Sequence, residues 1–184
     1  TCDLCIIGAG SGGLSVAAGA AQMGAKVVLI EKGDMGGDCL NTGGVPSKAL
    51  LAAAHAAQNA QRAGRFGVKT GKVSANAKKV FAHVHDVIAG IAPNDSQERF
   101  ESLGVTVIRA AAKFIAPDRV EAGDVRVKAK YFVVATGSHP FVPPIDGLAV
   151  LEPLTNETVF DLKAIPEHLI VMGRGPIGCE MAQA

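Results

Sequence analysis

The sequence predicts an α/β fold built on a Rossmann-like parallel sheet, and three observations support this prediction. Residues 4–7 and 26–30 are short β-prone apolar runs, and the glycine-rich turn and small residues 13–23 between them suit a helix. Alanine-rich helical sequence and then several short strands follow. The order of strand, glycine turn and helix begins again near residue 169. Strands and helices in this order form parallel sheets covered on both faces, and a chain that is 48% hydrophobic can bury such a core.

Two long helices are expected after the first βαβ unit. One runs from about Ser47 to Arg65, and Pro46 either begins it or kinks it. The other runs from about Ala75 to Leu103 and is broken near Pro93.

Short strands dominate the next part of the chain. They are predicted at residues 105–108, 113–115, 118–122, 125–129 and 131–136. We expect the strands before 131–136 to form a small antiparallel β flap on the main sheet. Residues 139–147 are rich in proline, so they are predicted to be a connecting loop.

The last residues repeat the first pattern, with a predicted strand at 169–172, a glycine turn and the start of a helix. An apolar strand and half a helix cannot bury themselves alone, so we interpret the chain as a fragment.

Composition excludes several kinds of partner. Lys and Arg together number 18 and Asp and Glu 17, so the net charge of +1 gives no reason to expect nucleic acid. The apolar runs are too short and too often interrupted to span a membrane. The absence of an export signal and the low cysteine content predict a cytoplasmic location, where disulfides are rare.

Gly8, Gly10 and Gly13 form the spacing G-x-G-x-x-G between a strand and a helix. The first glycine permits the tight turn, the second lets the backbone approach a pyrophosphate, and the third lets the helix pack on the strand. Glu31 ends the next strand, where an acid accepts from the ribose hydroxyls of an adenine dinucleotide. The alternative is a tight turn in an α/β domain without a ligand.

Gly173, Gly175 and Gly178 repeat this spacing and suggest a second dinucleotide. The evidence for this turn is weaker, because the second strand and its acid are missing. Arg174 also lies where glycine would pack more easily.

Four motifs carry a resemblance to a family. They are the first glycine turn, "GGDCLNTGGVPSK" (36–48), "ATGSHPFVPPIDG" (135–147) and "GRGPIGCE" (173–180). In this order they resemble the FAD-dependent pyridine nucleotide-disulfide oxidoreductases, with the dihydrolipoamide dehydrogenase-like and mercuric reductase-like branch the most similar. The resemblance implies an NAD(P)H-dependent FAD oxidoreductase that passes electrons to a small-molecule or protein-bound acceptor. It also implies a homodimer for the full-length protein.

The resemblance divides the chain into the first segment of an FAD-binding domain (1–150) and the start of an NAD(P)-binding domain (151–184). It implies cofactor contacts at three groups of positions. Gly8, Gly10, Ser11, Gly12, Gly13, Glu31, Lys32, Gly37 and Asp38 would contact the pyrophosphate, ribose and flavin phosphates of FAD. Ala112, Ala135, Thr136, Gly137 and Ser138 would contact the adenine and close over the cofactor. Gly173, Gly175, Pro176, Ile177 and Gly178 would hold NAD(P)H.

Lys48 and Glu180 are the most informative pair. The resemblance implies that they meet beside the reactive ring nitrogen of the flavin. A cation there stabilises negative charge on the reduced ring, and the carboxylate orients the cation. The alternative is an exposed lysine and a surface glutamate without a role.

Cys39 fits the first cysteine of the family's redox disulfide, but Gly44 occupies the position of the second. Cys2 and Cys5 are too far apart or on opposite faces of a strand to act together, and Cys179 is expected in a core. His83 and His85 do not face one another on a helix, so no metal site is predicted.

Three explanations of Gly44 stay open. It is a substituted residue in an ordinary disulfide reductase, a natural loss in a transhydrogenase-like flavoenzyme, or a mark of a non-catalytic flavin-binding module. We expect this chain by itself to be inactive. The sequence does not fix the acceptor or the choice between NAD and NADP.

Overall fold

The computed structural model describes residues 1–184. The strands are β1 Cys2–Ile7, β2 Val27–Glu31, β3 Thr106–Arg109, β4 Ala112–Ala116, β5 Arg119–Ala122 and β6 Val125–Val134. The α-helices are α1 Ser11–Gln22, α2 Gly37–Asn41, α3 Gly44–Arg62, α4 Ala77–Ile91, α5 Gln97–Ser102 and α6 Pro176–Gln183. Short 3₁₀ turns lie at Ala63–Phe66, Ala92–Asp95, Ala149–Leu151 and Val159–Asp161. No helix is both long enough and apolar enough to cross a membrane.

The chain forms two compact units. The sheet unit contains residues 1–41 and 90–139, and the helical unit contains residues 42–89 and 140–184. This division follows contacts within the chain and not cofactor domains. The domain boundary expected near residue 150 therefore stays a prediction.

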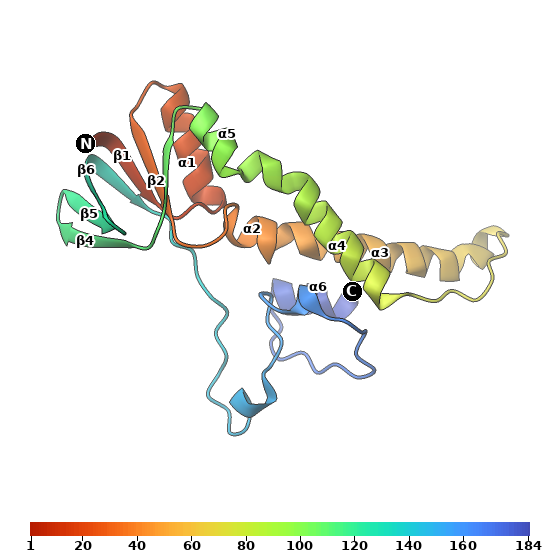
Figure 1. The fold of residues 1–184 in the computed structure, drawn as a ribbon. Coiled ribbons are helices and arrows are strands. Elements are labelled where there is room, and N and C mark those ends of the chain that lie inside the picture. Colours follow the sequence, from red (N-terminus) through yellow and green to blue (C-terminus); the bar gives the residue numbers. More distant parts are fainter. The chain divides into compact units, whose positions relative to one another are not determined.

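The sheet unit has one six-stranded sheet in the order β3-β2-β1-β6-β5-β4 (Figure 1). Strands β3, β2, β1 and β6 run parallel, and β5 and β4 continue the sheet antiparallel. This confirms the predicted α/β fold with its antiparallel flap. The two strands predicted at 125–129 and 131–136 are one strand, because Lys130 between them keeps the extended backbone. The first half of β6 pairs with β5 and its second half with β1.

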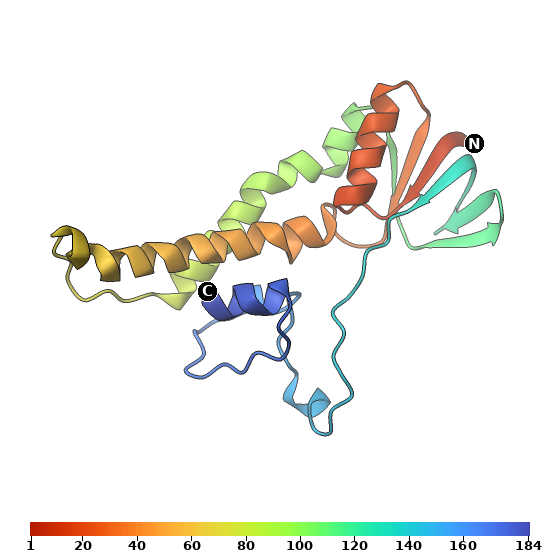
Figure 2. The same ribbon diagram turned by 180° about the vertical axis from the view of Figure 1, so that it is seen from behind.

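Side chains alternate between the two faces along the central strands, so buried apolar residues form one cluster on each face of the sheet. Ile6 and Leu29 pack on one face with Leu14 of α1 and with Phe100 of α5. Both views show α1 lying along this face (Figures 1 and 2). Val28, Ile30, Cys2 and Cys5 pack on the other face with the flap residues Val120, Ala122, Val127 and Ala129. Each large side chain buried in this way contributes about 2 kcal/mol to stability.

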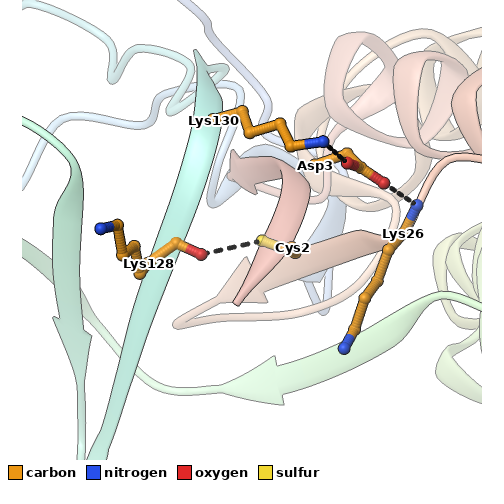
Figure 3. Close-up of polar contacts among 5 residues, drawn as sticks. All are labelled: Cys2, Asp3, Lys26, Lys128 and Lys130. Carbon is orange, nitrogen blue, oxygen red and sulfur yellow. Dashed lines mark hydrogen bonds and ion pairs between the residues drawn. The ribbon is translucent and has the colours of Figure 1, made fainter.

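Polar contacts hold β1 at its beginning (Figure 3). One carboxylate oxygen of Asp3 accepts from the Lys130 ammonium at 2.6 Å, and the other accepts from the Lys26 backbone N–H at 2.9 Å. The Lys130 contact is the main reason that the pKa of Asp3 is lowered. The Cys2 thiol donates to the Lys128 carbonyl oxygen at 3.7 Å. These contacts link β1 to β6 and to the residue before β2.

In the helical unit, α3 and α4 pack around Phe160, which is 4% exposed. Helix α3 begins three residues earlier than predicted, with Pro46 buried in its first turn. The second predicted helix is divided into α4, a 3₁₀ turn at Pro93 and α5, and this confirms the expected break.

The strand predicted at residues 169–172 is absent. A β-strand forms only where a neighbouring strand shares its hydrogen bonds, and no strand pairs with these residues. The prediction of Cys179 as a core residue is wrong for the same reason. With no strand to pack on, this face of α6 leaves Cys179 exposed.

Candidate functional site

The first glycine turn is held tightly between β1 and the residues after β6. Gly8 has φ +105°, and a Cβ there would lie 2.1 Å from the carbonyl oxygen of Ala135. A Cβ on Gly13 would lie 1.9 Å from the carbonyl oxygen of Gly8. Ala135 donates its backbone N–H to Ile7 at 2.8 Å. The turn therefore requires glycine at both positions, and it leaves no side chain between the backbone and an incoming ligand.

The N-terminus of α1 is open to an anion. Its N-cap residue, Gly10, gives no side-chain hydrogen bond, and the first turn contains no acid. The first intrahelical bond runs from the Leu14 N–H to the Gly10 carbonyl, so the N–H groups of Ser11, Gly12 and Gly13 have no acceptor within the helix. These donors and the helix dipole favour a phosphate at this end.

Glu31 reaches back to the same turn. One carboxylate oxygen, Oε2, accepts from the backbone N–H of Ala9 at 2.6 Å, and Oε1 accepts from the N–H of Gly33 at 2.7 Å. Each oxygen keeps a further lone pair. The carboxylate is therefore fixed beside the turn and can still accept from two ribose hydroxyls.

A loop after β2 closes against the first turn. The Gly36 N–H donates to the Ala9 carbonyl at 2.9 Å, and Gly10 pairs with Gly36 in an isolated parallel bridge. Gly37 has φ +57°, and a Cβ there would lie 2.6 Å from the Cα of Gly10. Asp38 follows in the first turn of α2, where an acidic residue is favoured by the helix dipole.

The remaining predicted FAD contacts lie at the edges of these elements. Ala135, Thr136, Gly137 and Ser138 follow β6 at the end where β1 also ends, so they flank the first turn. Lys32 follows β2 and is exposed, and Ala112 begins β4. Binding sites of open α/β sheets lie at the carboxyl ends of the parallel strands, where the strand order reverses. In this sheet that point lies between β1 and β6.

The second glycine turn repeats the conformation of the first. Gly173 has φ +108°, and a Cβ on Gly178 would lie 2.7 Å from the Gly173 carbonyl oxygen. The N-cap Gly175 has φ −74° and ψ 174°, against −80° and −176° at Gly10. No acid or side-chain cap occupies the start of α6. Pro176 removes one donor and leaves the N–H groups of Ile177 and Gly178 available.

Arg174 is exposed and does not disturb this turn. Its carbonyl oxygen accepts from the Cys179 thiol at 3.7 Å.

The structure brings Lys48 of α3 and Glu180 of α6 together in an ion pair. The Lys48 side chain is 68% exposed and that of Glu180 25% exposed. The pair lies in a shallow depression lined also by Leu51, Pro176, Cys179 and Gln183. The lysine cation is thus held by a carboxylate that follows closely on the second glycine turn.

No two cysteines form a disulfide. Cys39 lies in α2 and is exposed, and Gly44 begins α3 and is exposed. Cys2 and Cys5 are buried in one cluster, so the alternative of opposite faces is wrong, but the two thiols remain free. Burial raises the pKa of the Cys5 thiol to about 12, so it stays protonated. Position 44 therefore supplies no second thiol.

The residues present fit a bound flavin dinucleotide. The first turn is a cradle that a Cβ would fill, its helix supplies free N–H donors, and Glu31 faces it. Sequence reasoning missed two residues that support this cradle. The Arg109 guanidinium donates to the Gly33 carbonyl oxygen, and the Asn41 amide donates to the carbonyl oxygens of Met35 at 3.0 Å and Gly37 at 2.9 Å. Neither residue leaves a signal in the sequence, because both donate to backbone carbonyl oxygens.

Comparison with known proteins agrees with this arrangement. Residues 2–184 match the sequence family described as pyridine nucleotide-disulphide oxidoreductase. Mercuric reductase of Streptomyces lividans is 36% identical over 187 residues, covering 98% of this chain and 40% of that protein. Glutathione reductase of Burkholderia cepacia is 34% identical, covering 98% of this chain and 39% of that protein. Dihydrolipoyl dehydrogenase 2 of Arabidopsis thaliana chloroplasts is 34% identical, covering 98% of this chain and 32% of that protein.

The chain therefore spans at most about two fifths of the length of these three relatives. The resemblance predicted from the four motifs is confirmed: the chain belongs to the pyridine nucleotide-disulphide oxidoreductase family.

Proposed function

We propose that this chain supplies the FAD-binding cradle and part of the NAD(P)H site of an oxidoreductase that passes electrons from NAD(P)H to an acceptor. The observation that carries the proposal is the pair of glycine turns with matching backbone conformation. Family membership and the names of the relatives, all reductases or dehydrogenases, support it. FAD would supply the capacity to take two electrons from NAD(P)H and release them to a second substrate.

The residues of the chain would act by binding and orientation. The N–H groups of Ser11, Gly12 and Gly13 would bind the FAD pyrophosphate, and Glu31 would accept from the adenosine ribose. Those of Ile177 and Gly178 would bind the NAD(P)H pyrophosphate. Lys48 would place its charge where negative charge develops during reduction, and Glu180 would hold that ammonium in position.

The absorption spectrum of the protein tests this proposal. After incubation with FAD and removal of free flavin, we expect a bound-flavin spectrum in the visible range. A colourless protein would contradict the proposed function.

Gly44 favours a second, narrower proposal, in which electron transfer does not pass through a disulfide. A dithiol that reduces a disulfide substrate needs two sulfurs within bonding reach, and position 44 has none. We therefore expect no flavin–thiolate charge-transfer band when the protein is reduced with two electrons.

The substitution Gly44→Cys, made in the full-length protein, separates the three explanations of this position. If the ancestral enzyme was a disulfide reductase, the variant gains the long-wavelength band and reduces a lipoamide-type disulfide with NADH or NADPH. If the enzyme resembles a transhydrogenase, the original protein moves hydride between nicotinamide nucleotides and the variant gains nothing. If neither protein uses any acceptor, the flavin-binding module is supported instead.

A further inference from the structure

We propose that Arg109, the last residue of β3, is a positioning residue that aims the Glu31 carboxylate at the adenosine ribose of the bound flavin nucleotide. The proposal rests on the proposed function, because it assumes that the first glycine turn holds that nucleotide. It assigns a role to a side chain that itself needs no contact with the cofactor.

A continuous set of hydrogen bonds joins Arg109 to the first turn. Arg109 donates from Nη2 to the Gly33 carbonyl oxygen, and Gly33 donates its N–H to Oε1 of Glu31 at 2.7 Å. The other oxygen of Glu31 accepts from the Ala9 N–H at 2.6 Å. The register of the sheet supports this set, because Glu31 and Arg109 are direct partners on β2 and β3.

Gly33 is the most flexible residue in this set of hydrogen bonds by residue type. It is an exposed glycine in the loop after β2, and glycine loses more conformational freedom on folding than any other residue. A charge-assisted bond from a guanidinium restrains its carbonyl, and this in turn keeps its N–H directed at Glu31. Without Arg109, water would compete for both groups of Gly33, and Oε1 would lose its fixed partner.

The remaining surroundings leave Arg109 available for this role. It forms no ion pair with a carboxylate, although it lies near Glu98. The pKa of Glu98 is lowered chiefly by hydrogen bonds from its own backbone N–H and from Ser96, and the charge of Arg109 is the smallest contribution. Arg109 therefore has the Gly33 carbonyl as its specific acceptor.

The position of Glu31 matters because its two unused lone pairs are the acceptors for the ribose. A carboxylate held at both oxygens presents these lone pairs in one direction, whereas a carboxylate held at one oxygen can rotate. We therefore expect the loss of Arg109 to weaken binding of FAD more than binding of a flavin nucleotide that lacks a ribose hydroxyl.

The test compares FAD with an FAD analogue whose adenosine lacks the 2′-hydroxyl, using flavin fluorescence titration to measure Kd. Four proteins are compared: the unaltered protein, Arg109→Met, Arg109→Lys and Arg126→Met. Methionine keeps most of the length of the side chain but donates no hydrogen bond. Arg126 is a matched control, because it is an exposed arginine of β6 that pairs with Glu121 at 3.0 Å in the flap.

We expect the unaltered protein to prefer FAD over the analogue by about tenfold, the effect of one hydrogen bond to a charged group. In Arg109→Met the Kd for FAD rises about fivefold, the Kd for the analogue changes little, and the preference therefore falls to about twofold. Arg109→Lys restores part of the preference, and Arg126→Met retains all of it.

Several outcomes would overturn the proposal. Equal weakening of FAD and analogue in Arg109→Met would show a merely structural role, and an unchanged preference would show no role. If the unaltered protein binds neither ligand, both the proposed function and this inference fail. If the unaltered protein binds FAD but Arg109→Met keeps the full preference, only this inference fails. If Arg109→Met does not fold, as judged by thermal unfolding without flavin, the preference measured in Arg109→Lys decides: a full preference there overturns the proposal.

Discussion

Single backbone positions determine whether the first glycine turn can form. A Cβ on Gly13 would meet a backbone oxygen at 1.9 Å, which no rotation of a side chain can relieve. Gly12, the neighbouring residue in the same helical turn, has no atom within 4 Å of the point where a Cβ would lie. The two glycines therefore differ only in their surroundings, and this difference gives a matched pair of substitutions.

We expect Gly13→Ala to lower the free energy of unfolding by about 2 kcal/mol through overpacking and to abolish retention of FAD. Gly12→Ala should leave stability unchanged or raise it by up to about 1 kcal/mol, because alanine has the higher helix propensity. Urea unfolding of both variants without flavin measures the stabilities. Equal losses in the two variants would contradict the tight packing of helix α1 on the turn.

Burial divides the four thiols into two classes. Cys2 and Cys5 are buried and their pKa values are raised by desolvation, whereas Cys39 and Cys179 are exposed. Because the thiolate is the reactive species, we expect iodoacetamide at pH 8 to modify two cysteines in the folded protein and all four in denaturant. Mass spectrometry of peptides identifies the sites, and rapid labelling of Cys5 in the folded protein would show that β1 is not buried as described.

Whether the role of a residue could be predicted from the sequence depends on the kind of contact that it makes. Gly8, Gly13 and Glu31 follow from spacing, because the backbone of a strand and helix leaves one arrangement for them. Arg109 does not, since its partner is the backbone carbonyl of Gly33, and a backbone acceptor leaves no trace in residue type. The structure places each predicted site residue, but their roles toward cofactors stay predictions.

Individual elements were predicted where the chain itself supplies their partners. Strands β2 and β6 both pair with β1, and the apolar pattern of the three strands was sufficient to find them. Residues 169–172 have the same apolar pattern, but no strand pairs with them, and Ile170 and Met172 are exposed. Helix α6 after the second glycine turn still forms, because a helix makes its backbone hydrogen bonds within its own residues. A pattern therefore predicts a helix from local sequence, but a strand only together with its neighbours.

The contact between α3 and α6 gives a prediction at the level of elements. An exposed ion pair contributes little to stability, so we expect Lys48→Met and Glu180→Gln to change the free energy of unfolding by less than about 0.5 kcal/mol. Under the proposed function, each should nonetheless slow reduction of bound FAD by NAD(P)H at least about tenfold when it is made in the full-length protein. Stopped-flow absorbance measures the rate, with Lys79→Met, an exposed lysine of α4, as the control. Unchanged rates in both variants would remove Lys48 and Glu180 from the site.

On the scale of the whole molecule, the sheet unit is closed by contacts between segments far apart in the sequence. The chain adds β2 and β3 on one side of β1 and then returns to place β6 on its other side. The reversal creates the edge at which the first turn, Glu31 and residues 135–138 meet. The alternation of strands and helices predicted a parallel sheet with an antiparallel flap, but not this strand order. The sequence did not predict the polar contacts at the opposite end of β1, since they depend on the final register.

Those polar contacts predict how the sheet unit responds to acid. The pKa of Asp3 is lowered, first by Lys130, and that of Asp118 is lowered, first by Lys128. A carboxyl group whose pKa is lower in the folded state stabilises the fold while it is ionised, and this stabilisation is lost as the pH falls through the folded-state pKa. We therefore expect the thermal midpoint to fall as the pH is lowered below about 4, the ordinary range for aspartate.

The substitution Asp3→Asn isolates one of these groups. It should lower the thermal midpoint at pH 7, where Asp3 is ionised and bound to Lys130, and have a smaller effect near pH 3, which lies below the ordinary pKa of aspartate. Asp124→Asn is the control, because Asp124 lies in the turn between β5 and β6 and forms no ion pair. Calorimetry at pH 7, 5, 4 and 3 gives the comparison. If the difference between Asp3→Asn and the unaltered protein grows toward pH 3, the sign of the linkage is wrong, and the contact with Lys130 does not hold β1 to β6 in solution.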